Sequence, residues 1–189
     1  MTVRRVGLFG GTFDPPHLGH VAALRAAADT GRFERIVVTV AGDPYLKRER
    51  GVVLPASLRL AMAEAAFAAL PLVQVSDREI RRDGPSYTID TVRELLGPCG
   101  EVDLLIGADL IDQLATWHEA EVLATLVRVG VVPRNAGPSS TIVGWRIYDI
   151  AMEPVDLSSS FIRELTPTSE NLHDFLPDEV VPLYVGYRG

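Results

Sequence analysis

Apolar and polar residues follow one another along this chain in blocks that predict a regular succession of strands and helices. Short runs rich in β-branched residues are typical of buried parallel strands. The longer, often Ala-rich segments between them favour helix. The predicted strands lie at residues 6–9, 36–40, 72–75, 102–106, 127–132 and 145–150. The predicted helices lie at residues 18–30, 55–70, 86–96, 110–115, 119–126, 159–165 and 178–187.

This alternation predicts an α/β fold with a doubly wound, mostly parallel sheet and right-handed crossovers. We expect a single domain over residues 1–189, because no linker, internal repeat or low-complexity segment divides the chain. Ligands of such sheets bind beyond the carboxyl ends of the strands, near the point where the strand order reverses. The loops that should meet there are 10–20, 42–50, 84–88, 107–118 and 133–135.

The stretch VGLFGGTFDPPHLGH, residues 6–20, carries the clearest chemical signal. Gly10 and Gly11 leave the backbone open to a ligand above the end of the first strand. His17 and His20 follow at the start of a helix, three residues apart and therefore on one face. The free N–H groups and the dipole of a helix start favour an anion. The stretch therefore predicts a phosphate site.

Other interpretations of this stretch are weaker. The glycines are not followed by Gly-Lys-Ser or Gly-Lys-Thr, and their spacing does not fit the dinucleotide fingerprint G-x-G-x-x-G. Asp43 follows the second strand, where a ribose-binding acid would lie, but without the fingerprint we treat that as coincidence. A metal site on His17 and His20 lacks an evident third ligand. Single histidines usually have a structural role. The presence of two histidines directly after a Gly-Gly turn argues against that interpretation here.

A second signal is the segment DLSSSFIR at residues 156–163. A serine cluster before an apolar helix is typical of a helix N-cap. The same residues could bind an anion, because hydroxyls and N–H groups gather at the helix start and Arg163 lies one turn further on. A guanidinium offers phosphate oxygens a permanent charge and a fork of donors. From this segment alone, both interpretations stay open.

Composition narrows the class of protein. With 189 residues, 47% of them hydrophobic and 23% charged, the chain can form the full core of a soluble globular domain. A formal charge of −7 argues against an extended nucleic-acid surface but allows a local basic pocket. The single cysteine, Cys99, fits a reducing compartment. We find no signal peptide and no bilayer-spanning apolar stretch, and so expect a cytoplasmic protein without a membrane partner.

Two of these segments resemble known signatures. Residues 10–20, GGTFDPPHLGH, closely resemble the phosphate-binding signature of the nucleotidylyltransferase superfamily, whose core is a T/H-x-G-H tetrad, here residues 17–20. Residues 156–163 resemble its second signature, I-S-S-T-x-I-R, with Ser160 where the family usually has threonine. The departure keeps the hydroxyl group.

Three further segments resemble the nicotinate-mononucleotide adenylyltransferases of the bacterial type. They are DREI with GPSYT within residues 77–88, IGAD with TWH within 106–118, and VPR at 132–134. Together with the two phosphate signatures they cover about residues 3–187 in the family's order. The ordered set is more specific than any one of the motifs.

The resemblance implies a Rossmann-like nucleotidylyltransferase fold and a reaction in NAD biosynthesis. The adenylyl group of ATP, accompanied by Mg²⁺, would pass to nicotinate mononucleotide, giving nicotinate adenine dinucleotide and pyrophosphate. The implied catalytic residues are His17, His20 and Arg163. The implied ATP-binding residues are Gly10, Gly11, Thr12, Phe13, His17, His20, Gly107, Asp109, Arg134, Ser158, Ser159, Ile162 and Arg163. The implied substrate-binding residues are Thr12, Lys47, Tyr87, Thr88, Asp109 and Trp117. No residue is implied as a metal ligand.

Each of these roles has a plain structural alternative. Trp117 could stack on a pyridine ring or pack in the core. The helix start at Tyr87 and Thr88 could bind a carboxylate or simply be capped. Asp109 could accept hydrogen bonds from a ribose or cap the next helix. Lys47 could bind substrate phosphate or belong to a solvated charged run, and Arg134 likewise could bind phosphate or lie in solvent. His118 is expected to orient the Trp117 loop.

Three other functions stay open. The chain could adenylylate nicotinamide mononucleotide or another phosphate such as phosphopantetheine. It could be a nucleotide-binding regulator that has lost turnover, although His17, His20 and Arg163 are all present. A hydride-transferring dehydrogenase is disfavoured by the missing fingerprint. The expected partners are ATP and nicotinate mononucleotide, with no nucleic acid, and a homo-oligomer is left open.

Overall fold

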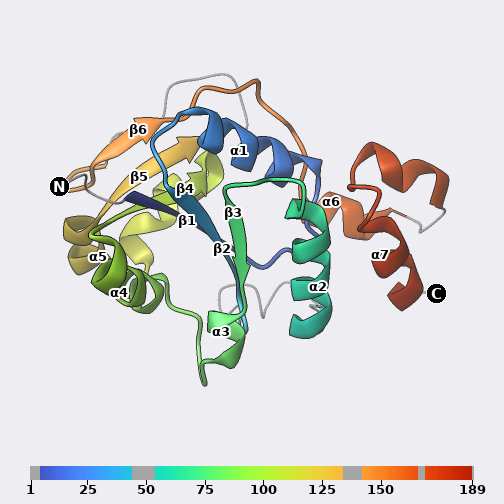
Figure 1. The fold of residues 1–189 in the computed structure, drawn as a ribbon, viewed down its shortest axis with the longest axis horizontal. Helices are drawn as coiled ribbons and strands as arrows, with labels where there is room; N and C mark the ends of the chain where they lie inside the picture. Colours follow the sequence, from blue (N-terminus) through green and yellow to red (C-terminus); the bar gives the residue numbers. More distant parts are fainter. Residues whose placement is uncertain (1–4, 44–53, 134–141, 166–168, 189) are drawn as a thin grey trace.

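The computed structural model describes residues 5–43, 54–133, 142–165 and 169–188. Six parallel strands form one sheet in the order β3-β2-β1-β4-β5-β6 (Figure 1). They are β1 (Arg5–Gly11), β2 (Arg35–Val40), β3 (Val73–Ser76), β4 (Glu101–Gly107), β5 (Val127–Val132) and β6 (Ile147–Asp149). The strand order reverses between β1 and β4, which are neighbours. The predicted α/β class with a doubly wound parallel sheet is confirmed.

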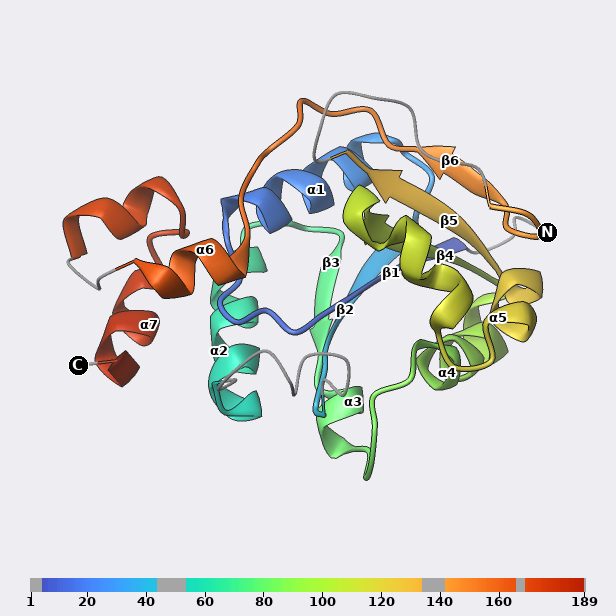
Figure 2. The ribbon, with the colours of Figure 1, turned by 180° about the vertical axis from the view of Figure 1, so that it is seen from behind.

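Helices cover both faces of this sheet (Figures 1 and 2). One hydrophobic core lies between one face of the sheet and four helices. They are α1 (Leu18–Asp29), α2 (Ala56–Phe67), α6 (Ser159–Glu164) and α7 (Val181–Arg188). Residues of α4 (Thr88–Cys99), the 3₁₀ helix η2 (Ala108–Thr116) and α5 (Ala120–Leu126) share the other core. Leu104 and Leu105, adjacent in β4, belong to different cores. Burial on both faces explains why the four central strands, β1, β2, β4 and β5, appear as mostly apolar runs.

Two described helices are absent from the predicted elements. The segment after β3 is predicted to be irregular, but it contains α3 (Arg78–Arg81), in which Glu79 is buried and accepts a hydrogen bond from the Thr91 hydroxyl at 2.8 Å. The second is the 3₁₀ helix η3 (Ser169–Asp174). A single turn that is stabilised by a tertiary contact leaves no periodic pattern in the sequence.

The helix predicted at 178–187 begins at Val181 instead, with Pro182 in its first turn, where the fixed φ of proline fits a helix. The strand predicted at 145–150 is shorter, since β6 spans only Ile147–Asp149. Across the described ranges, no helix combines the length and the apolar character that crossing a bilayer needs.

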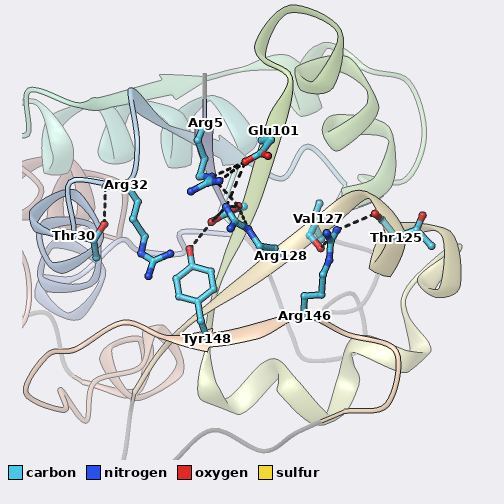
Figure 3. A network of polar contacts seen from close by, with 10 residues as sticks. Arg5, Thr30, Arg32, Glu101, Thr125, Val127, Arg128, Arg146 and Tyr148 are labelled. Atoms are coloured by element: carbon cyan, nitrogen blue, oxygen red, sulfur yellow. Dashed lines mark hydrogen bonds and ion pairs between the residues drawn. The ribbon is translucent and has the colours of Figure 1, made fainter. Parts of the chain in front are cut away.

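A charged network lies at the amino ends of β1, β4 and β5 (Figure 3). Its centre is Asp103, which is only 1% exposed. Its carboxylate accepts hydrogen bonds from Arg128 Nε at 3.2 Å and from the Tyr148 hydroxyl at 2.8 Å. Burial, reinforced by the bond to Asp103, raises the pKa of Tyr148, so its hydroxyl keeps the proton that it donates. A buried charge needs such partners, which explains how a carboxylate is accommodated inside β4.

We therefore expect Tyr148→Phe to destabilise the protein. The substitution removes one hydrogen bond to a buried charge, and such bonds contribute about 1.5–3 kcal/mol. Urea unfolding followed by circular dichroism measures the change in the free energy of unfolding. Tyr187→Phe is the matched control, because Tyr187 is 55% exposed. Equal midpoints for the Tyr148→Phe variant and the unmodified protein would contradict this account of Asp103.

Candidate active site

A cavity of about 430 Å³ opens at the carboxyl ends of β1, β2, β4 and β5. It lies where the strand order reverses, as the fold class predicts. The structure brings most of the predicted site residues together in its wall. These are Gly10, Gly11, Thr12, Phe13, His17, His20, Thr88, Gly107, Asp109, Trp117, Ser158, Ser159 and Arg163.

Four of the predicted residues are not placed in this wall. Ile162 is fully buried in the core, which its place on the inner face of α6 explains. The ring of Tyr87 stacks on His118 with centroids 4.0 Å apart. Tyr87 therefore supports the turn that carries Trp117, and the expectation that His118 orients this turn agrees with that contact. Lys47 and Arg134 lie outside the described residues.

The two glycines after β1 have different reasons to be glycine. A Cβ on Gly11 would lie 2.8 Å from the ring of Phe13. That ring is buried and lies against His20 and Phe67, with centroids 5.1 and 5.7 Å away, so it has no room to move. A Cβ on Gly10 would make only an ordinary contact, 3.4 Å from Thr39 Oγ1. The sequence assigns both glycines to ligand approach, but the structure assigns Gly11 to the packing of Phe13.

The two histidines form a stacked pair at the start of α1. Their ring centroids are 3.7 Å apart, and His17 is only 2% exposed. The backbone N–H of His17 donates a hydrogen bond to His20 Nδ1 at 3.1 Å. In the neutral form of His20 the proton must then be on Nε2, which makes that atom a hydrogen-bond donor. A Cβ on Gly19 would lie 3.0 Å from His17 Nδ1, so the glycine of the tetrad makes room for the stacked rings.

Hydrogen bonds connect the two phosphate signatures to each other. Arg163 donates to the carbonyl oxygen of Asp14 at 2.7 Å and to Ser160 Oγ at 3.1 Å. The Ser159 hydroxyl donates to the carbonyl oxygen of Pro15 at 2.9 Å. Both interpretations of the serine cluster, helix capping and anion binding, are therefore compatible with the structure. Ser158 caps α6 by accepting from the N–H of Phe161 at 3.1 Å, while Arg163 reaches the cavity wall.

The predicted site residues leave out Asp14, Ser86 and Ser160, which line the cavity, and Arg59 of α2, which holds the main chain beside it. The Arg59 side chain is 1% exposed and donates to the carbonyl oxygens of Thr12, Ala41 and Leu54 at 2.7–2.8 Å. Burial lowers the pKa of Arg59, and the carboxylate of Asp14 opposes that shift. The sequence contains one signal for the burial of Arg59, because this residue lies on the same helical face as the other buried residues of α2.

The wall of the cavity can therefore bind negative charge at one end and a ring at the other. The imidazoles and Arg163 lie together on one side, beside the first turn of α1 and the positive end of its helix dipole. Trp117, half-buried, lies in the wall with Thr88, the first residue of α4. In the part of the chain that the structure describes, no three His, Cys, Asp or Glu side chains gather as metal ligands.

Comparison with known sequences assigns the chain to a family. Residues 8–165 match the cytidylyltransferase-like family. A probable nicotinate-nucleotide adenylyltransferase of Methylibium petroleiphilum is 36% identical over 191 residues, covering 97% of this chain and 89% of that protein. The protein of the same description from Chromobacterium violaceum is 35% identical over 204 residues, covering 96% and 95% of the two chains.

Comparison with solved structures agrees on the fold. The nicotinic acid mononucleotide adenylyltransferase of Plasmodium falciparum, complexed with NaAD, is similar with a TM-score of 0.80. The match covers 98% of this chain and 96% of that one. The same protein complexed with APC gives a TM-score of 0.75. With identities of 17% and 18%, these likenesses establish the fold.

The different surroundings of Gly10 and Gly11 lead to a paired prediction. Gly11→Ala forces a methyl group against the enclosed Phe13 ring, and we expect a loss of about 1–3 kcal/mol in the free energy of unfolding. Gly10→Ala is the control and should change that free energy by less than about 0.5 kcal/mol. Thermal and urea unfolding measure both. Equal stability of the two variants would contradict the assigned role of Gly11.

Proposed function

This chain belongs to the cytidylyltransferase-like family and, within it, to the nicotinate-nucleotide adenylyltransferases, and from that premise we propose its reaction. It transfers the adenylyl group of ATP to nicotinate mononucleotide, giving nicotinate adenine dinucleotide and pyrophosphate, a step of NAD biosynthesis. The observation that carries the proposal is the joining of the two phosphate signatures. Arg163 and Ser159 bind the main chain of the loop that leads to His17 and His20, at the rim of one cavity.

The reaction requires the protein to position both substrates and to supply positive charge. A phosphate oxygen of nicotinate mononucleotide attacks the α-phosphorus of ATP, a new P–O bond forms, and pyrophosphate leaves with the electrons of the bond that breaks. The attacking phosphate is already a nucleophilic anion, so the reaction needs no general base and no covalent enzyme intermediate. The protein must hold two polyanions in line and offset the charge of the transition state.

We assign the triphosphate of ATP to the basic side of the cavity. His20 offers Nε2–H, Arg163 offers its guanidinium, and the start of α1 offers the positive end of the helix dipole. His17 stacks on His20 and holds it in place. Gly107, the last residue of β4, and Asp109, in the first turn of η2, are the proposed contacts of the nucleoside part. The phosphate-binding roles of Lys47 and Arg134 stay proposals from the resemblance alone.

Mg²⁺ is proposed to enter with ATP. This ion keeps several waters and binds substrate phosphates with one or two carboxylates, and Asp14 and Asp109 are carboxylates of the described wall. Bound there, the ion supplies charge neutralisation to the leaving pyrophosphate. His17 and His20 are more suited to donate hydrogen bonds to phosphate than to bind this hard cation.

We assign the pyridine nucleotide to the side of Trp117 and α4. The indole offers a flat face to the pyridine ring. The start of α4 at Thr88 offers N–H groups and the positive end of the helix dipole to its carboxylate. The stack of Tyr87 on His118 fixes the turn that carries Trp117. Thr12, between the two sides, is the proposed contact common to both substrates.

Pyrophosphate release from ATP tests the assignment. The unmodified protein is given ATP and Mg²⁺ with nicotinate mononucleotide, nicotinamide mononucleotide or phosphopantetheine, and products are identified by mass spectrometry. We expect nicotinate adenine dinucleotide from the first. Tight ATP binding in calorimetry without pyrophosphate release from any acceptor would favour a regulator that has kept the pocket.

His20→Ala should slow turnover by about 10²-fold or more, the loss expected for one preorganised donor. The fold should remain, because His20 is only partly buried in the first turn of α1. Steady-state rates and thermal unfolding are measured on the same samples. Arg25→Ala, an exposed position of the same helix, is the control. A His20→Ala variant that melts early yet keeps its turnover per folded molecule would show a structural role.

Nicotinate mononucleotide should be preferred over the amide by about 10²-fold or more in kcat/KM. The helix dipole contributes about 0.3–1 kcal/mol to carboxylate binding and charge-assisted hydrogen bonds about 1.5–3 kcal/mol, while each 1.36 kcal/mol is a factor of ten. Trp117→Ala should weaken both substrates and largely preserve their ratio, because stacking does not distinguish the charge. Equal turnover of acid and amide would contradict the role given to α4.

A further inference from the structure

We propose that Arg59 is a positioning residue for the pyridine-nucleotide half of the site. It is absent from the cavity wall and acts through the main chain of residues 41–43 and through Ser86. This inference rests on the proposed function, to which it adds the element that holds the acceptor side of the cavity.

The first observation is a buried cation whose described partners are main-chain carbonyl groups. Arg59 donates to the oxygens of Leu54, Thr12 and Ala41 at 2.8, 2.8 and 2.7 Å, and more weakly to that of Gly42 at 3.4 Å. The carboxylate of Asp14 attracts it electrostatically, but its hydrogen bonds to described residues all go to main-chain carbonyl oxygens. Burying a guanidinium is costly, and an apolar residue would fill the same space at lower cost. The guanidinium is therefore better explained by the carbonyl groups that it gathers than by packing.

The second observation is the orientation of two successive peptide groups. In a planar trans peptide, the C=O of one residue and the N–H of the next point in opposite directions. The C=O groups of Ala41 and Gly42 point to Arg59. The N–H groups of Gly42 and Asp43 point to Ser86 Oγ, at 3.0 and 3.3 Å. Both peptides are thus held between Arg59 on one side and Ser86 on the other.

The third observation is that the main chain at Gly42 is closely packed. A Cβ on Gly42 would lie 2.4 Å from the carbonyl oxygen of Glu79, so the main chain here is pressed against α3. The N–H of Ser86 donates back to the carbonyl oxygen of Asp43 at 3.3 Å. Ser86 lies two residues before Thr88, the first residue of α4, and both line the cavity. A displacement of residues 41–43 must therefore displace the start of α4.

The ATP side has its own connections. Arg163 and Ser159 hold the loop at Asp14 and Pro15, and neither bond involves Arg59. In that loop Arg59 donates one hydrogen bond, to the carbonyl oxygen of Thr12, and is attracted by the carboxylate of Asp14. Disturbing Arg59 should consequently affect the pyridine nucleotide much more than ATP. A residue that only stabilised the fold would affect both substrates alike.

Arg59→Lys is the central variant, because it keeps the charge but loses the planar fork that reaches several carbonyl groups at once. We expect KM for nicotinate mononucleotide to rise about tenfold and KM for ATP to change less than about twofold, as when one hydrogen bond is lost on one side only. The preference for acid over amide should fall as well. Met62→Ala is the matched control: Met62 is fully buried in the same helix and contacts neither peptide by a hydrogen bond. It should lose stability while keeping both KM values.

Ser86→Ala tests the connection itself. It removes the acceptor of the Gly42 and Asp43 N–H groups. If Arg59 and Ser86 act on the same two peptides, the double variant raises KM for nicotinate mononucleotide by less than the product of the single effects. Effects that multiply would contradict the inference.

Amide hydrogen exchange by NMR separates this inference from the proposed reaction. In Arg59→Lys, the N–H groups of Gly42 and Asp43 should lose protection that they keep in Met62→Ala. Unchanged exchange there, or KM values for both substrates that rise equally, would overturn the inference. If the unmodified protein forms no nicotinate adenine dinucleotide, the proposed reaction fails, and the exchange data alone then decide the role of Arg59.

Discussion

The candidate site depends on how the loop after β1 is held. Two arginines from different helices bind carbonyl groups of this loop: Arg59 at Thr12 and Arg163 at Asp14. Each bond satisfies a polar group in a water-poor region, where an unpaired carbonyl would be costly. With the loop held in this way, the glycine backbone that precedes it and the two imidazoles that follow it line the cavity. An anion at this point meets the imidazoles and the guanidinium of Arg163, which lies 3.7 Å from the carboxylate of Asp14.

The same arrangement explains how a chain with a formal charge of −7 can bind two polyanions. Positive groups are concentrated at one point, the start of α1, while acidic side chains in the site are mostly engaged elsewhere. Glu79 accepts from Thr91, and Asp14 lies beside Arg163. Such preorganised donors need not reorient during the reaction, which is the main source of electrostatic catalysis. Position and charge then suffice for direct transfer between two bound phosphates.

Much of the fold and part of the site could be predicted from the sequence. Buried parallel strands appear as apolar runs, and the span predicted for β5 is the one observed. The first signature is continuous in sequence, so the proximity of His17 and His20 follows from helix geometry. The place of Arg59 on the apolar face of its helix does not by itself predict its burial, because a charged residue in an Ala-rich helix is ordinarily exposed. The stack of Tyr87 on His118 and the packing of Phe13 on Gly11 could not be predicted either. No local sequence pattern determines the side-chain directions of these residues.

Isotope exchange between labelled pyrophosphate and ATP tests the central claim of direct transfer most directly. With ATP and Mg²⁺ alone, the account predicts no exchange, because the adenylyl group has no acceptor on the protein. Adding nicotinate mononucleotide should start exchange, and substituting His20 by alanine should suppress it. Exchange with ATP alone would reveal an adenylylated enzyme and contradict direct transfer. The absence of isotope exchange under both conditions would contradict adenylyl transfer itself.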